Sequence, residues 1–95
     1  MPAFLIAEVE VTDPVAYEEY KKLAPAAIAA YGGRYVVRGG ASETLEGPPQ
    51  TKRLVVLEFP SMDKARTFYH SPEYTAARAK RANAGSARFV IVEGL

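Results

Sequence analysis

The 95-residue chain contains no cysteine, no tryptophan and a single histidine, His70. Without cysteine it can form no disulfide, no thiolate metal site and no thiol nucleophile. One histidine without cysteine also falls short of an ordinary zinc site. We therefore expect neither a metal ion nor a cofactor.

An excess of one charge is also lacking, since twelve Lys and Arg face eleven Asp and Glu, for a net charge of +1. Proteins that bind nucleic acid usually carry a marked basic excess. The predicted strand at residues 52–59 lacks the interleaved aromatic side chains on which bases stack. Basic residues from Lys64 to Arg81 are then best interpreted as a solvated helix face, and no nucleic-acid partner is expected.

Long apolar runs are absent as well, because none approaches the roughly 20 residues of a membrane span. Met1-Pro2-Ala3 leads directly into a predicted strand, without a basic segment or a cleavage site. We expect a cytoplasmic protein with no membrane partner.

The apolar pattern predicts four strands and two helical regions within one domain, residues 1–95. Asp13 and Pro14 begin the first helix, whose apolar stripe runs to Tyr31, with a kink expected near residues 21–23 because Pro25 interrupts the hydrogen bonding. The second region breaks at Ser71-Pro72. The predicted strands are Ala3–Val11, Arg34–Arg38, 52–59 and 87–93. The predicted helices are 14–31, 61–69 and 72–82. A long loop is predicted over 39–51.

The order strand, helix, strand, strand, helix, strand predicts an α+β, ferredoxin-like βαββαβ protomer with two helical regions on one face of an antiparallel sheet. Three strands carry apolar residues on both faces, such as Phe4 and Ile6 in the first. Leaving six such side chains in water would forgo on the order of 10 kcal/mol. We therefore expect a homodimer that packs two sheets face to face and encloses a partly polar space.

Several short motifs resemble the domain of unknown function 1330 group of the dimeric α+β barrel superfamily. They are Asp13-Pro14 with Tyr17 and Tyr20, Tyr31 to Arg34, Arg38-Gly39-Gly40, Leu45-Glu46-Gly47, Glu58-Phe59-Pro60-Ser61, Ser71-Pro72-Glu73-Tyr74, Arg81 and Glu93-Gly94. The resemblance covers nearly the whole chain. It implies a dimeric barrel with distant kinship to cofactor-free monooxygenases and isomerases of small organic molecules, and it implies no established activity.

Arg38 and Glu58 are the main candidates for chemistry. Arg34 and Arg38 lie four residues apart in a strand, so period two predicts that they share one sheet face. A guanidinium suits a carboxylate or enolate, and Arg38 adjoins the flexible Gly39-Gly40 loop. Glu58 follows an apolar strand and is a candidate general base with a raised pKa. The alternative for both is a structural ion pair.

The remaining candidates have structural alternatives too. Tyr17 and Tyr20 offer phenol groups to a ligand, or they only pack in the core. Tyr74 and Arg81, seven residues apart on one helix face, are further ligand-binding candidates. His70 is a candidate acid, base or single axial ligand for haem, or else a solvated residue before the Ser71 cap.

Two functions from different classes follow. The first is a cofactor-independent oxygenase or isomerase-like enzyme that holds a small, partly apolar organic molecule between sheet and helices, with Arg38 fixing an anionic group and Glu58 moving a proton. The second is a non-catalytic ligand-binding or structural dimer, in which Arg38 and Glu58 neutralise each other.

Overall fold

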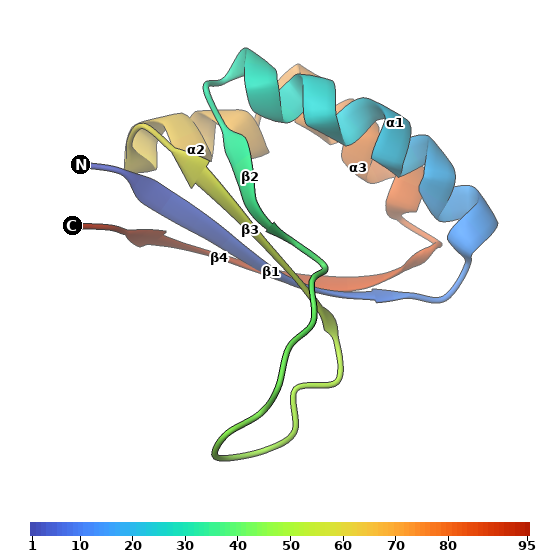
Figure 1. Cartoon of the computed structure of the whole chain (residues 1–95). Helices are drawn as coiled ribbons and strands as arrows, with labels where there is room; N and C mark the ends of the chain where they lie inside the picture. The colour runs from blue at the N-terminus through green and yellow to red at the C-terminus, as the bar shows by residue number, and fades with distance from the viewer.

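The computed structural model describes all 95 residues, Met1–Leu95, as a four-stranded antiparallel sheet with helices on one face (Figure 1). The strands lie in the order β2-β3-β1-β4. The elements are β1 (Ala3–Val11), α1 (Pro14–Ala30), β2 (Arg34–Arg38), β3 (Arg53–Phe59), α2 (Met62–Tyr69), α3 (Pro72–Arg81) and β4 (Gly85–Glu93). The predicted ferredoxin-like βαββαβ order is confirmed, with the second helical region split at Ser71-Pro72.

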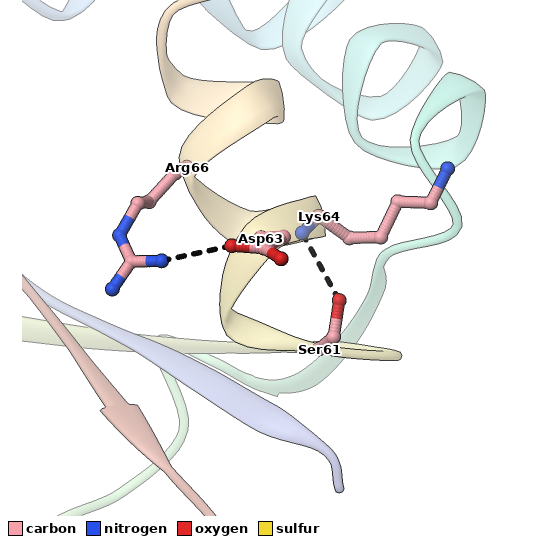
Figure 2. A network of polar contacts seen from close by, with 4 residues as sticks. All are labelled: Ser61, Asp63, Lys64 and Arg66. Carbon is pink, nitrogen blue, oxygen red and sulfur yellow. Dashed lines mark hydrogen bonds and ion pairs between the residues drawn. The ribbon is translucent and has the colours of Figure 1, made fainter.

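Each helix begins where the sequence supplies a cap. Asp13 accepts a hydrogen bond from the amide of Ala16, and Pro14 occupies the first turn, where its missing amide hydrogen costs nothing. Ser61 accepts from the amide of Lys64 at the start of α2, as Figure 2 shows. Ser71 does the same for Tyr74 in α3. Helix α1 continues through Pro25 as one helix.

The core lies between the inner face of the sheet and the helices. In β1 the odd residues Leu5, Ala7 and Val9 are buried, whereas Ile6, on the outer face, is 36% exposed. Phe59 of β3 stacks on Phe68 of α2, and Phe68 stacks on Tyr74 of α3. These aromatic contacts fix α2 and α3 above the sheet.

The outer face of the sheet is apolar along its middle. The strand register places Val37, Val56, Ile6 and Val90 in one row across all four strands. No helix covers this face (Figure 1). The expectation of apolar residues on both sheet faces is confirmed.

The long loop predicted over residues 39–51 is present and spans 39–52, because β3 begins at Arg53, one residue later than predicted. It extends from one end of the sheet on the side away from the helices (Figure 1). Strand β4 begins at Gly85, two residues earlier than predicted, because Gly85 pairs with Val11 at the end of β1. None of the three helices is long and apolar enough to cross a membrane.

Candidate functional site

A cavity between the sheet and α1, called here the inner cavity, contains most of the predicted ligand-binding residues. The cavity itself has a volume of about 40 Å³, within about 520 Å³ of space between the walls that includes the open mouth. It is therefore a narrow slot. Its lining residues are Leu5, Ala7, Val9, Tyr17, Tyr20, Lys21, Ala24, Ile28, Tyr35, Arg38, Arg53, Val55, Leu57, Tyr74 and Phe89.

Small side chains are what leave this space open. Ala7 on β1 lies between Val55 on β3 and Phe89 on β4 in the register, and Ala24 lines the slot from α1. Both alanines are only 2% exposed, so their small volume lies within the core. Close packing would fill the slot if either position held a larger apolar residue.

Tyrosine hydroxyls form the polar part of the inner cavity. The hydroxyl of Tyr20 lies 2.7 Å from that of Tyr74, and Arg81 donates from Nη2 to the Tyr74 hydroxyl at 3.4 Å. Burial raises the pKa of Tyr20, and the neighbouring Tyr74 raises it further. Burial also raises the pKa of Tyr17 and of Tyr35. Tyr17, Tyr20 and Tyr35 are therefore protonated at neutral pH, and they can donate hydrogen bonds to a ligand.

Three cations line the inner cavity, and no acidic residue does. The Arg38 guanidinium lies 4.3 Å from the centre of the Tyr35 ring. Lys21 is paired with Glu18 at 3.3 Å, whereas Arg38 and Arg53 form no ion pair. These two arginines favour an anionic group on any molecule that enters.

Gly39 makes room for Arg53. Its φ is +70°, a conformation that suits glycine, and a Cβ at this position would contact the Arg53 guanidinium. The sequence reasoning missed Arg53 and Lys21 as cavity residues. Period two in β3 places Arg53 on the face of Val55 and Leu57, and Lys21 follows Tyr17 by one helical turn, so both signals were present.

The prediction that Arg34 and Arg38 share one sheet face is wrong. Arg34 lies opposite Glu58 and is paired with it, and Arg38 lies opposite Val55 in the inner cavity. A register shift between Tyr35 and Val37 adds one residue to β2, and such a β-bulge reverses the alternation beyond it. The two arginines therefore point to opposite faces.

Glu58 and Arg38 consequently do not meet at one site within the chain. The Glu58 side chain is 26% exposed and lies on the outer face, bound to Arg34. Its predicted place on the face of Leu54 and Val56 agrees with the strand register. The ion pair considered as its alternative role exists, with Arg34 as the partner.

The structure gathers Tyr17, Tyr20, Tyr74 and Arg38 around the inner cavity, whereas His70 and Arg81 line a different cleft between α2, α3 and β4. His70 caps the C-terminal end of α2, is exposed, and sets its ring edge-on to Tyr69 with the centroids 5.2 Å apart. No group of three or more His, Cys, Asp or Glu side chains is placed to hold a metal ion.

The topology and the helices on a single sheet face define a ferredoxin-like protein. The chain belongs to the family described as domain of unknown function (DUF1330), whose model matches residues 2–95. No curated protein matches the sequence.

Solved structures with the same fold include proteins of several descriptions. A protein of unknown function from Rhodopseudomonas palustris is 21% identical, with a TM-score of 0.78, over 99% of this chain and 82% of its own. A dimeric protein of unknown function with a ferredoxin-like fold, from Bacteroides fragilis, is 19% identical, with a TM-score of 0.63, over 98% of this chain and 96% of its own. SnoaB, a cofactor-independent oxygenase from Streptomyces nogalater, is 13% identical, with a TM-score of 0.65, over 99% and 93%. Identities this low show a shared fold.

The raised pKa of Tyr20 predicts a loss of stability in alkali. Its folded pKa exceeds the unfolded value of about 10, so its contribution is complete below that pH. Above pH ~10 the unfolded chain releases the phenol proton first, and the free energy of unfolding falls by up to about 1.4 kcal/mol per pH unit for each such group. Tyr20→Phe should make this slope shallower in urea unfolding at fixed protein concentration.

At neutral pH the same variant should lose about 1 kcal/mol, the usual net value of one hydrogen bond. Tyr17 and Tyr35 remain and still contribute a slope. An alkaline slope identical to that of the wild type would show that the Tyr20 phenol is not protected by burial.

Proposed function

We propose that the protein is a homodimer that binds a small, flat, mainly apolar organic acid in the inner cavity of each chain. The observation that carries this proposal is the composition of the slot. Twelve of its fifteen lining residues are hydrophobic, and its charged residues, Lys21, Arg38 and Arg53, are all cations. Ligand sites of this kind combine an apolar wall with a few polar groups that fix orientation.

The polar groups would divide the recognition between them. Arg38 and Arg53 would bind the anionic group, since a guanidinium donates two parallel hydrogen bonds to a carboxylate. Tyr17 and Tyr20 would donate to a carbonyl or hydroxyl oxygen. The apolar floor of Leu5, Ala7 and Leu57 would contact the body of the ligand.

The structure supports ligand binding better than it supports catalysis by Glu58 and His70. Glu58, the candidate base, lies across the sheet from Arg38, and His70 lines another cleft. The buried phenols with raised pKa values hold their protons at neutral pH, so they serve as donors and not as bases. The likeness to SnoaB concerns the fold, and enzymatic turnover remains the second candidate.

The homodimer is supported by the outer face of the sheet. The apolar row of Val37, Val56, Ile6 and Val90 lies between two mixed rows. One row holds Arg34 and Glu58 with Phe4 and Val92, and the other holds Glu8 and Arg88 with Leu54. An apolar centre with a polar rim is the usual anatomy of a protein interface. A second copy offers the same pattern and can match it around a twofold axis.

Replacing Arg38 should weaken the binding of an organic anion selectively. We use benzoate as the anionic probe and benzamide as its neutral counterpart, measured by calorimetry. Arg38→Gln should lower benzoate affinity about tenfold or more, because it removes a charge-assisted pair of hydrogen bonds, and should leave benzamide nearly unchanged. Lys22→Gln is the matched control, since Lys22 is exposed, paired with Glu19 and outside the slot.

If Arg38→Gln and Lys22→Gln had the same effect on benzoate, the anion would be attracted by overall charge, and the proposed site would be wrong.

Glu58→Gln separates the catalytic and the binding functions. If the chain only binds its ligand, this variant should keep benzoate affinity and any turnover while its melting temperature falls, because the ion pair with Arg34 is lost. Arg34→Gln removes the same pair and serves as the comparison. Loss of turnover in Glu58→Gln with activity kept in Arg34→Gln would favour the catalytic function.

An aspartate in the apolar row should dissociate the dimer. Val90 is 36% exposed on the outer face, whereas Val15, on α1, is 82% exposed and far from that face. Sedimentation should show a dimer for the wild type and for Val15→Asp, and a monomer for Val90→Asp, because a buried unpaired charge is costly. A wild-type chain that stays monomeric at micromolar concentration would exclude the dimer.

A further inference from the structure

A second, wider cleft lies between α2, α3 and β4, and we call it the arginine cleft. Its volume is about 380 Å³, whereas that of the inner cavity is about 40 Å³. Arg66 and His70 reach it from α2 and its cap, and Arg78 and Arg81 reach it from α3. Its floor is formed by Ala87, Phe89 and Ile91 of β4.

The charge of this cleft is one-sided. Three arginines line it, and no Asp or Glu does. Arg66 is bound to Asp63 at 3.0 Å, as Figure 2 shows, and Asp63 is 94% exposed beyond the lining. Arg78 and Arg81 take part in none of the ion pairs of the chain.

The unpaired guanidiniums are nevertheless held in place. Arg78 lies over the Tyr69 ring with its guanidinium carbon 4.6 Å from the centre, and Arg81 lies over Phe89 at 5.0 Å. Stacking on a ring fixes the plane of a guanidinium while its edge stays free to donate hydrogen bonds. Rigid donors lose less entropy when a ligand binds.

Arg81 also has a buried hydrogen-bond donor without an acceptor. Its Nε is buried and has no hydrogen-bond partner, and its guanidinium donates to the hydroxyl of Tyr74 at 3.4 Å. Glu10 lines a small neighbouring crevice with Arg81, but the two form no ion pair. A partly buried cation without an anion is unfavourable, and a negative group in the cleft would compensate it.

We infer that the arginine cleft is a binding site for a small polyvalent oxyanion, of the phosphate-ester or multiple-carboxylate class, distinct from the inner cavity. The rings of Tyr69 and Phe89 are already covered by guanidiniums, so the cleft offers charged hydrogen-bond donors more than an aromatic surface. Its larger volume leaves room for a hydrated, multiply charged ligand, whereas the inner cavity is smaller and mainly apolar in its lining. The inference does not depend on the ligand proposed for the inner cavity.

Pyrophosphate and citrate are suitable probes, with acetate at matched ionic strength as the monovalent reference. Nitrogen-edited NMR should show shifts of amides in residues 65–70 and at Ala87 and Ile91, and not around Tyr35 and Leu57 in the inner cavity; Phe89 lines both spaces and does not distinguish them. Pyrophosphate or citrate should bind at least about tenfold more tightly than acetate, because several charge-assisted hydrogen bonds form at once. The two probes together show whether phosphate or carboxylate groups are preferred.

Arg78→Gln should weaken binding of the preferred probe about tenfold, since one guanidinium partner is removed. Lys80→Gln is the matched control, because Lys80 lies on the same helix, is exposed, carries the same charge and does not line the cleft. It should change the affinity less than twofold, as expected for a distant exposed charge screened by salt. Arg38→Gln should also leave the affinity for the probe unchanged, because Arg38 lines the inner cavity and not the arginine cleft.

Three outcomes of comparing the probes and the variants would overturn the inference. They are equal affinity for acetate and the polyvalent probes, equal losses in Arg78→Gln and Lys80→Gln, and loss of binding in Arg38→Gln, which would place the anion in the inner cavity. Arg78 is half-buried and Lys80 is exposed, and neither belongs to the buried core, so both α3 variants should keep the wild-type amide spectrum outside the cleft. Failure of pyrophosphate and citrate to bind at millimolar concentration would have the same meaning.

Discussion

The alternation of β1 determines what each face of the sheet can do. This strand pairs with β3 on one side and with β4 on the other, so its register sets the inward and outward residues of both neighbours. Its inward residues Leu5, Ala7 and Val9 are buried under the helices, and its outward residues begin with Phe4 and Ile6. A slip by one residue would exchange the two sets, so strong burial on one face holds the register. The inner cavity and the outer apolar row both follow from that register.

The bulge in β2 is the one place where strict alternation fails, and the failure has chemical consequences. Without it, Arg38 would lie with Arg34 on the outer face, opposite Leu54, and the inner cavity would lose a cation. With it, Arg34 neutralises Glu58 outside while Arg38 faces the slot. Bulges are common at sheet edges and next to binding sites, where they redirect a side chain, and β2 is an edge strand.

The fold could be predicted from the sequence because its signals are local and agree with one another. The caps Asp13, Ser61 and Ser71 and the alternation of β1 each specify one element, and the order of the elements leaves little freedom in topology. The bulge could not be predicted, since Tyr35, Val36 and Val37 all suit a regular strand and the extra residue appears only when β2 pairs with β3. The arginine cleft was missed for a related reason. Its basic residues were interpreted as a solvated helix face, and the geometry of α2, α3 and β4 decides which of them face a common space.

A short chain of hydrogen bonds runs from the inner cavity to the arginine cleft. Tyr20 lines the inner cavity, Tyr74 is bound to it, and Arg81, which lines the arginine cleft, is bound in turn to Tyr74. Since Tyr74 is only 1% exposed, water cannot readily replace either contact. An anion that draws Arg81 toward the cleft would weaken the hydrogen bond that Arg81 donates to the Tyr74 hydroxyl, and this would alter the Tyr20–Tyr74 pair that shares the same hydroxyl. Occupancy of one space is thereby linked to the hydrogen bonding available in the other, and any such coupling of affinities must be reciprocal.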